Sequence, residues 1–163
     1  MNAPLREPLK FDINGLVQAV RGNQTNDNFT PALTAAQWEI LASYMQPFAL
    51  MIGQRLIEQG AADRTLYLVE SGSLTVHYED DKGRVRLAVV AAGSAVGEGA
   101  FFTRQPRNAT VQAAASSKIW CLTPIRFTEL SHRHPAVALE LAMALGSLVS
   151  RRLVNKPKRI AVT

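Results

Sequence analysis

The first 45 residues carry a helical pattern of apolar positions. Apolar residues recur every three to four positions in residues 13–20 and again in residues 34–45, which predicts two amphipathic helices. Thr34 and Gln37 have the spacing of a capping box, in which two side chains satisfy free backbone amides at the start of a helix. The polar residues 22–28 predict a mobile loop between the helices. We therefore expect residues 1–45 to form an N-terminal helical segment.

In residues 46–123 the apolar pattern changes to a period of two, which is the period of β-strands. The apolar runs are short, and glycines or the sequence Asp81-Lys82-Gly83 separate them. Asp81-Lys82-Gly83 predicts a hairpin turn. Short strands at regular spacing favour an antiparallel sandwich or barrel over a sheet built from βαβ units. We expect residues 46–123 to form this β structure.

The helical period returns in residues 124–163. Thr123 and Pro124 predict the start of a short helix, and Pro135 predicts the start of a longer one that ends near Leu153. The longer helix has two apolar stripes. The three-leucine stripe consists of Leu141, Leu145 and Leu148, and the Met143 stripe consists of Leu139, Met143, Gly146 and Leu153. A surface helix that is apolar on two sides needs a second cover, so we expect the three-leucine stripe to form a symmetric dimer.

Composition argues against several classes of protein. A single cysteine, Cys121, excludes an internal disulfide and a multi-cysteine metal site. The three histidines lack the spacing of a metal triad, so we expect no metal and no cofactor. No apolar run approaches the roughly 18 residues of a membrane span, and the first ten residues lack the apolar core of a signal peptide. We therefore expect a cytoplasmic protein that does not bind a membrane.

The net charge of +5 is local. Five of the 18 basic residues lie in residues 151–163, which contain no acid, so the remaining 150 residues carry 13 basic and 13 acidic groups. These 150 residues therefore have no general electrostatic attraction to DNA. We expect the basic residues 151–163 to form a solvated tail, and the alternative is a docking segment for an acidic partner.

Residues 96–111 contain the candidate chemistry. Gly97 and Gly99 flank Glu98 ahead of an apolar turn, and Arg107 follows Pro106. A helical turn over residues 98–103 would leave three amides unpaired at its positive end, those of Gly99, Ala100 and Phe101. Such an end attracts phosphate. The Arg107 guanidinium would bind the same anion, while Glu98 is suited to accept a hydroxyl proton. A phosphorylated ribose would satisfy both residues.

At these residues the chain closely resembles the cyclic nucleotide-binding domain family, which includes protein kinase A regulatory subunits, the catabolite activator protein and cyclic-nucleotide-gated channels. Other matching positions fall where that family turns its strands: Gly53, Gly60, Asp63, Leu66-Tyr67, Gly72 and Gly93. The resemblance covers about residues 46–155. It implies an antiparallel β-barrel of the double-stranded β-helix or jelly-roll type, with N-terminal helices, a short phosphate-binding helix and C-terminal helices that form a lid.

The resemblance also implies the roles of individual residues. Glu98 would accept the ribose 2′-hydroxyl, and Arg107 would hold the cyclic phosphate. The expected ligand-binding residues are Gly97, Glu98, Gly99, Ala100, Arg107, Asn108 and Ala109. Two of these depart from the family, because Gly99 stands where relatives usually have leucine or methionine, and Asn108 where they often have alanine, serine or threonine. Asn108 leaves the choice between cAMP and cGMP open.

We therefore expect a sensor, not an enzyme, that binds cAMP and signals to a protein effector in trans through its C-terminal helix. About ten residues follow Leu153, too few for a helix-turn-helix, so we expect no direct binding to DNA. The alternative is a barrel that does not bind nucleotide and acts as a protein scaffold, or the truncated sensor of a transcription regulator. In a third interpretation Glu98 and Arg107 merely pair with each other.

Overall fold

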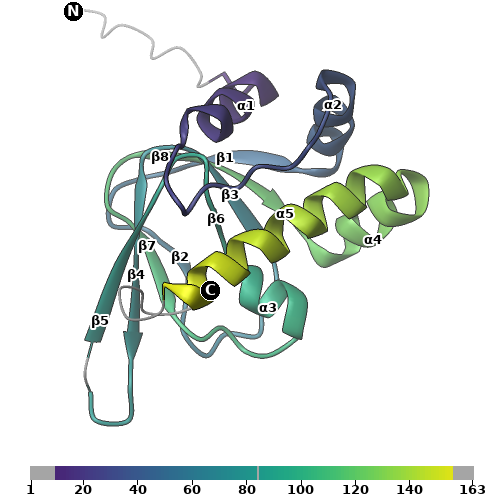
Figure 1. Cartoon of the computed structure of the whole chain (residues 1–163). Coiled ribbons are helices and arrows are strands. Elements are labelled where there is room, and N and C mark those ends of the chain that lie inside the picture. The colour runs from purple at the N-terminus through teal and green to yellow at the C-terminus, as the bar shows by residue number, and fades with distance from the viewer. Residues whose placement is uncertain (1–9, 84, 156–163) are drawn as a thin grey trace, which may run out of the picture.

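The computed structural model of the protein describes residues 10–83 and 85–155. The helices in these residues are α1 (Ile13–Gly22), α2 (Ala35–Tyr44), α3 (Glu98–Thr103), α4 (Pro124–Arg133) and α5 (Pro135–Val154) (Figure 1). The strands are β1 (Gln46–Leu50), β2 (Arg55–Ile57), β3 (Leu66–Ser71), β4 (Ser73–Glu79), β5 (Val85–Ala91), β6 (Ala95–Val96), β7 (Thr110–Ala113) and β8 (Ser117–Leu122). None of the helices in the described ranges is long and apolar enough to cross a bilayer.

The strands form two four-stranded sheets in which neighbouring strands are antiparallel. One sheet has the order β1-β8-β3-β6 and the other the order β2-β7-β4-β5. The expectation of a mainly β fold with flanking helices is therefore confirmed. The strand pairing of the described residues gives two separate sheets, so the closed barrel that we expected is not seen.

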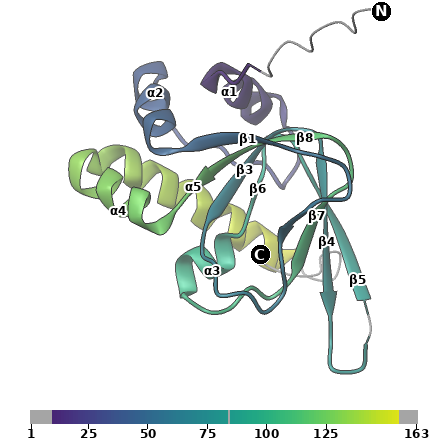
Figure 2. The same ribbon diagram turned by 180° about the vertical axis from the view of Figure 1, so that it is seen from behind.

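Two apolar cores hold the layers together. The inner core lies between the two sheets, and strand residues such as Val69, Val76 and Ile119 pack there. The opposite face of the β1-β8-β3-β6 sheet, which includes Leu68 and Trp120, packs against the helices. In Figure 1, α1 and α2 lie above the strands and α5 crosses in front of them, and the view from behind in Figure 2 shows the strands in front of α5. This sheet is therefore buried on both faces.

Local sequence signals positioned the helix ends correctly. Thr34 and Gln37 form the expected capping box at the start of α2. The Thr123 side chain accepts a hydrogen bond from the Arg126 amide, and Pro124 is the first residue of α4. The predicted turn at residues 81–83 joins β4 to β5, with Gly83 at a φ of 73°. Each of these signals depends on residues only a few positions apart, so it can be recognised without knowing how the rest of the chain folds.

The prediction of a dimer through the three-leucine stripe is wrong. All three leucines of the stripe are fully buried in the helical core of their own chain. The Met143 stripe instead faces outward, with Leu139 60%, Met143 64% and Leu153 56% exposed. Both stripes are apolar in the sequence, and packing in the core between the helices and the strands buries the three-leucine stripe.

One sheet ends in an apolar strand. β5 is the end strand of its sheet, beside β4. The side chains of Val85, Leu87 and Val89 alternate along β5 and are largely exposed. They make one outer edge of the molecule apolar.

Candidate functional site

A left-handed glycine connects β6 to the short helix α3. Gly97 is the N-cap of α3 and has a φ of 87°. A Cβ atom at this position would lie 2.7 Å from the Thr65 carbonyl oxygen and 2.8 Å from Nη1 of Arg107. Both the backbone conformation and the lack of space therefore require glycine. The close approach brings Arg107 against the start of α3, as the sequence predicted.

The start of α3 offers fewer free amides than we expected. The Phe101 amide donates to the Gly97 carbonyl at 3.2 Å, so the prediction that it is unpaired is wrong. By helix geometry, the amides of Gly99 and Ala100 have no acceptor within α3 itself. Arg64 holds the other end of the helix, where it donates to the carbonyl oxygens of Ala100 and Phe101 at 3.3 and 3.2 Å. Sequence analysis did not identify Arg64, because capping of a distant helix by a loop arginine has no local pattern.

Arg107 is 3% exposed and is held by three acceptors. Its Nη1 donates to the Gly97 carbonyl at 3.0 Å, and its Nη2 donates to the Thr65 carbonyl at 2.6 Å and to Oδ2 of Asp63 at 2.7 Å. Its Nε is buried and finds no hydrogen-bond partner among the described residues. A buried donor without an acceptor costs roughly 1–3 kcal/mol, so this N–H favours an acceptor that a ligand brings.

The carboxylate of Asp63 is the counterion of Arg107. Burial raises the pKa of Asp63, but hydrogen bonds from Arg107 and Thr65 outweigh this effect, and the pKa is lowered overall. A group whose pKa is lowered by folding stabilises the folded state at neutral pH, and this stabilisation is lost as the pH falls below about 4. The sequence indicates only a turn at Asp63, whereas in the structure its carboxylate accepts a hydrogen bond from Arg107 and holds it in place.

Glu98 lies in the first turn of α3 and is completely buried, with 0% exposure. Its Oε1 accepts a hydrogen bond of 2.5 Å from Nη1 of Arg152, near the end of α5. Glu98 therefore has its own cation in Arg152, and Arg107 has its own anion in Asp63. These two ion pairs account for the burial of Glu98 and Arg107. The interpretation in which the two residues merely pair with each other is therefore not needed.

Arg152 connects α5 to the site, a role that no local pattern indicates. The residue is 4% exposed, so the prediction that it belongs to a solvated basic tail is wrong. Burial lowers the pKa of Arg152, but the charges of Glu98 and Asp27 outweigh it and raise the pKa above its ordinary value. Arg152 therefore remains a cation. Of the other four basic residues of the predicted tail, Lys156, Lys158 and Arg159 lie outside the described residues.

The remaining predicted site residues are placed less uniformly. Asn108 is exposed beside Arg107. The Ala109 side chain packs in the core between the sheets, so only its backbone is available for the predicted ligand contact. Phe101 packs against Phe127 of α4, with ring centroids 5.1 Å apart, which links α3 to the C-terminal helices. The described residues contain no group of three or more His, Cys, Asp or Glu side chains that could hold a metal ion.

Comparisons with known proteins agree with this geometry. Among curated proteins, the chain is 31% identical over 99 residues to the cAMP-dependent protein kinase regulatory subunit of Blastocladiella emersonii. The aligned region covers 60% of this chain and 25% of that protein. The chain spans 25% or less of the length of the first curated relatives that it matches.

Solved structures show the same fold. A cyclic nucleotide-binding domain from Methylobacillus flagellatus superposes with a TM-score of 0.78 at 20% identity, over 91% of this chain and 85% of that one. The catabolite activator protein of Thermus thermophilus superposes with a TM-score of 0.69 at 25% identity, over 77% of this chain and 58% of that one. The family model of the cyclic nucleotide-binding domain matches residues 48–134. The chain therefore belongs to the cyclic nucleotide-binding domain family.

Proposed function

We propose that this chain is a sensor module that binds cAMP without chemical turnover and signals to a protein partner through α5. The observation that carries the proposal is the buried Nε of Arg107, which has no acceptor among the described residues and lies on a guanidinium already fixed by Asp63, Thr65 and Gly97. A cyclic phosphate would supply the acceptor and a negative charge. The names of two relatives, a cAMP-dependent protein kinase regulatory subunit and a cGMP-dependent protein kinase, support a cyclic nucleotide of either base.

In this proposal, each part of the nucleotide has its own residues. Arg107 and the amides of Gly99 and Ala100 take the cyclic phosphate. Glu98 accepts the ribose 2′-hydroxyl, because an ionised carboxylate is an acceptor only. Asn108 lies at the exposed edge, where it would face the base. Its amide both donates and accepts, so we expect only a modest preference for cAMP over cGMP.

Calorimetric titration tests the proposal directly. A ligand of about 22 non-hydrogen atoms that contributes roughly 0.3 kcal/mol per atom gives about 7 kcal/mol, which corresponds to a Kd near ten micromolar. We expect cAMP to bind in this range and linear AMP to bind more weakly. The absence of saturable heat with either cyclic nucleotide at about 1 mM would contradict the proposal.

A protein scaffold that does not bind nucleotide is the second candidate function. One observation favours it, because Glu98 is completely buried and already bonded to Arg152. The same titration separates the two functions, since a scaffold gives no heat with either nucleotide. The unpartnered Nε of Arg107 leads us to prefer the sensor.

We further propose that the signal involves a homodimer formed by the outward-facing Met143 stripe. Its members, together with Ser150, follow the alternating spacing of four and three residues that a two-helix seam prefers: Leu139, Met143, Gly146, Ser150 and Leu153. Sedimentation at about 100 micromolar should show a dimer, and Met143→Glu should return it to a monomer of unchanged helicity. Leu145 lies in the core, so Leu145→Glu should instead unfold the chain. A parent chain that stays monomeric would contradict the dimer.

A further inference from the structure

The carboxylate that is proposed to bind ribose is out of reach of any ligand in this conformation. Glu98 has no exposed surface, and Nη1 of Arg152 lies 2.5 Å from its Oε1. A ribose hydroxyl must come within about 3 Å of the same carboxylate to donate a hydrogen bond. Binding at Glu98 therefore requires a movement, and Arg152 at the end of α5 is a described side chain that is bonded to this carboxylate.

Arg152 is anchored on its other side by the loop between α1 and α2. Its Nε and Nη2 donate to the two carboxylate oxygens of Asp27 at 2.8 and 3.2 Å. Nη2 also donates to Oγ of Ser94 and to the Ala95 carbonyl, at 3.1 and 2.8 Å. One guanidinium thus joins a loop acid, strand β6 and the site acid Glu98.

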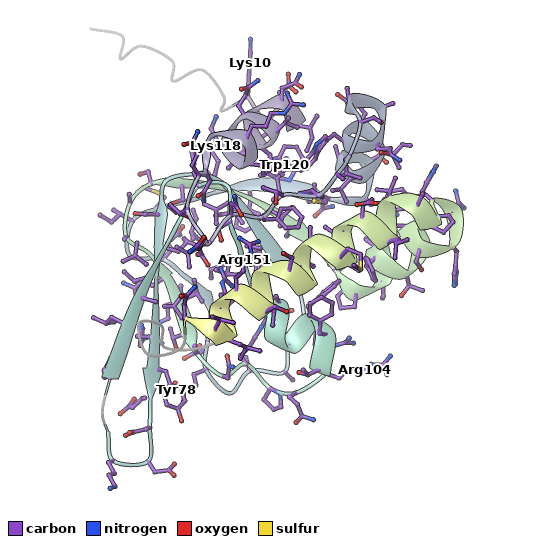
Figure 3. All side chains as sticks on the ribbon, in the orientation of Figure 1. Lys10, Tyr78, Arg104, Lys118, Trp120 and Arg151 are labelled. Atoms are coloured by element: carbon purple, nitrogen blue, oxygen red, sulfur yellow. The ribbon has the colours of Figure 1, made fainter. Side chains whose placement is uncertain are left out.

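The neighbouring Arg151, labelled in Figure 3, fastens the same turn of α5 to the same loop. It donates to the Asn26 carbonyl at 2.8 Å and to the side-chain and backbone oxygens of Asn28 at 2.6 and 2.9 Å. The last turns of α5 are therefore tied to residues 26–28 rather than resting on the strands through apolar contacts alone.

We propose that Asp27, Arg152 and Glu98 form a latch that limits access to the nucleotide site, so that Asp27 and Arg152 set the affinity although neither contacts the nucleotide. This inference rests on the proposed function. Both charge-assisted contacts of Arg152 must be given up when the end of α5 moves away. The observed affinity is the intrinsic affinity multiplied by the fraction of molecules with the latch open. Weakening the latch should therefore tighten binding.

The test is calorimetric titration of the full chain with cAMP, before and after substitution. Arg152→Gln keeps a donor for Glu98 but removes the positive charge and the paired N–H groups that bind Asp27. We therefore expect cAMP binding about tenfold tighter than in the parent. Asp27→Asn removes one of the two anions, and we expect binding about threefold tighter. Arg126→Gln is the matched control. Arg126 of α4 also joins two helices, because it donates to the Ser43 carbonyl of α2, and it pairs with Glu129 of its own helix. It lies outside the latch. Its affinity should equal that of the parent.

Hydrogen exchange without nucleotide gives a second measurement that does not depend on binding. In Arg152→Gln and Asp27→Asn, amides in residues 26–29 and 147–155 should exchange at least threefold faster than in the parent, while β3 and β8 stay unchanged. Equal exchange rates would overturn the latch even where the affinity has changed.

The outcomes distinguish failure of the latch from failure of the proposed sensor function. A parent that binds cAMP while Arg152→Gln binds equally or more weakly overturns the latch and leaves the sensor intact. Binding by Arg152→Gln but not by the parent supports the latch, but the sensor proposal then fails for the parent chain. If neither binds any cyclic nucleotide, the sensor proposal fails and the latch fails with it.

Discussion

Arg107→Ala is expected to weaken cAMP binding by about ten- to hundredfold. The substitution removes a charge-assisted interaction with the cyclic phosphate, which contributes roughly 1.5–3 kcal/mol. It also removes the counterion of Asp63, so we expect the pKa of Asp63 to rise, because the hydrogen bond from Arg107 that lowered it is gone. Titration calorimetry measures the first effect, and the pH dependence of unfolding measures the second.

Arg104→Ala is the matched control for this variant. Arg104 ends α3, only three residues before Arg107, and in Figure 3 its side chain points away from the rest of the molecule. It is exposed to solvent, so the substitution should leave the affinity nearly unchanged. Equal binding by Arg107→Ala and the parent would mean that the phosphate is held elsewhere, and the assignment of Arg107 would fail.

Gly97→Ala should damage both stability and binding. Alanine at a φ of 87° is strained, and its methyl group would meet the Thr65 carbonyl and the Arg107 guanidinium at less than 3 Å. Strain of this kind costs on the order of 1–3 kcal/mol. Displacement of Arg107 should also weaken cAMP binding by about tenfold, because a binding group held in the wrong place loses its hydrogen bonds. Thermal unfolding and calorimetry measure the two effects separately.

Gly53→Ala isolates the steric part of this prediction. Gly53 has a φ of 84°, but an added Cβ would meet nothing within 4 Å. It should therefore show only the backbone strain, with unchanged nucleotide affinity. If Gly97→Ala and Gly53→Ala behave alike in both measurements, then the tight packing of Gly97 against Arg107 has no role in binding.

Much of the fold follows from patterns that act over a few residues. The capping box at Thr34, the proline at the start of α4 and the bounds of α3 were all predictable, because each depends on residues within one helical turn. The candidate site was predictable in part for the same reason, since Gly97, Glu98 and Arg107 lie in one short stretch. Their roles as ligand contacts remain predictions that the binding experiments test.

The partners of these residues could not be predicted from local patterns. Asp63 precedes Arg107 by 44 residues, and Asp27 precedes Arg152 by 125 residues. An arginine at the end of an apolar helix looks the same in the sequence whether it is solvated or buried. Only the packing of α5 across the strands turns Arg152 inward, and the same packing decides which apolar stripe of α5 is buried.

The apolar end strand β5 sets a practical limit on this chain. The outer edge of a sheet presents unpaired backbone groups, and it becomes a template for other chains when the side chains beside it are apolar. Val85, Leu87 and Val89 give β5 this character. In crowded or heated samples, pairing of β5 with the opposite end strand β2 of the next copy would leave free edges and could continue, whereas symmetric pairing through β5 or α5 would stop at two copies.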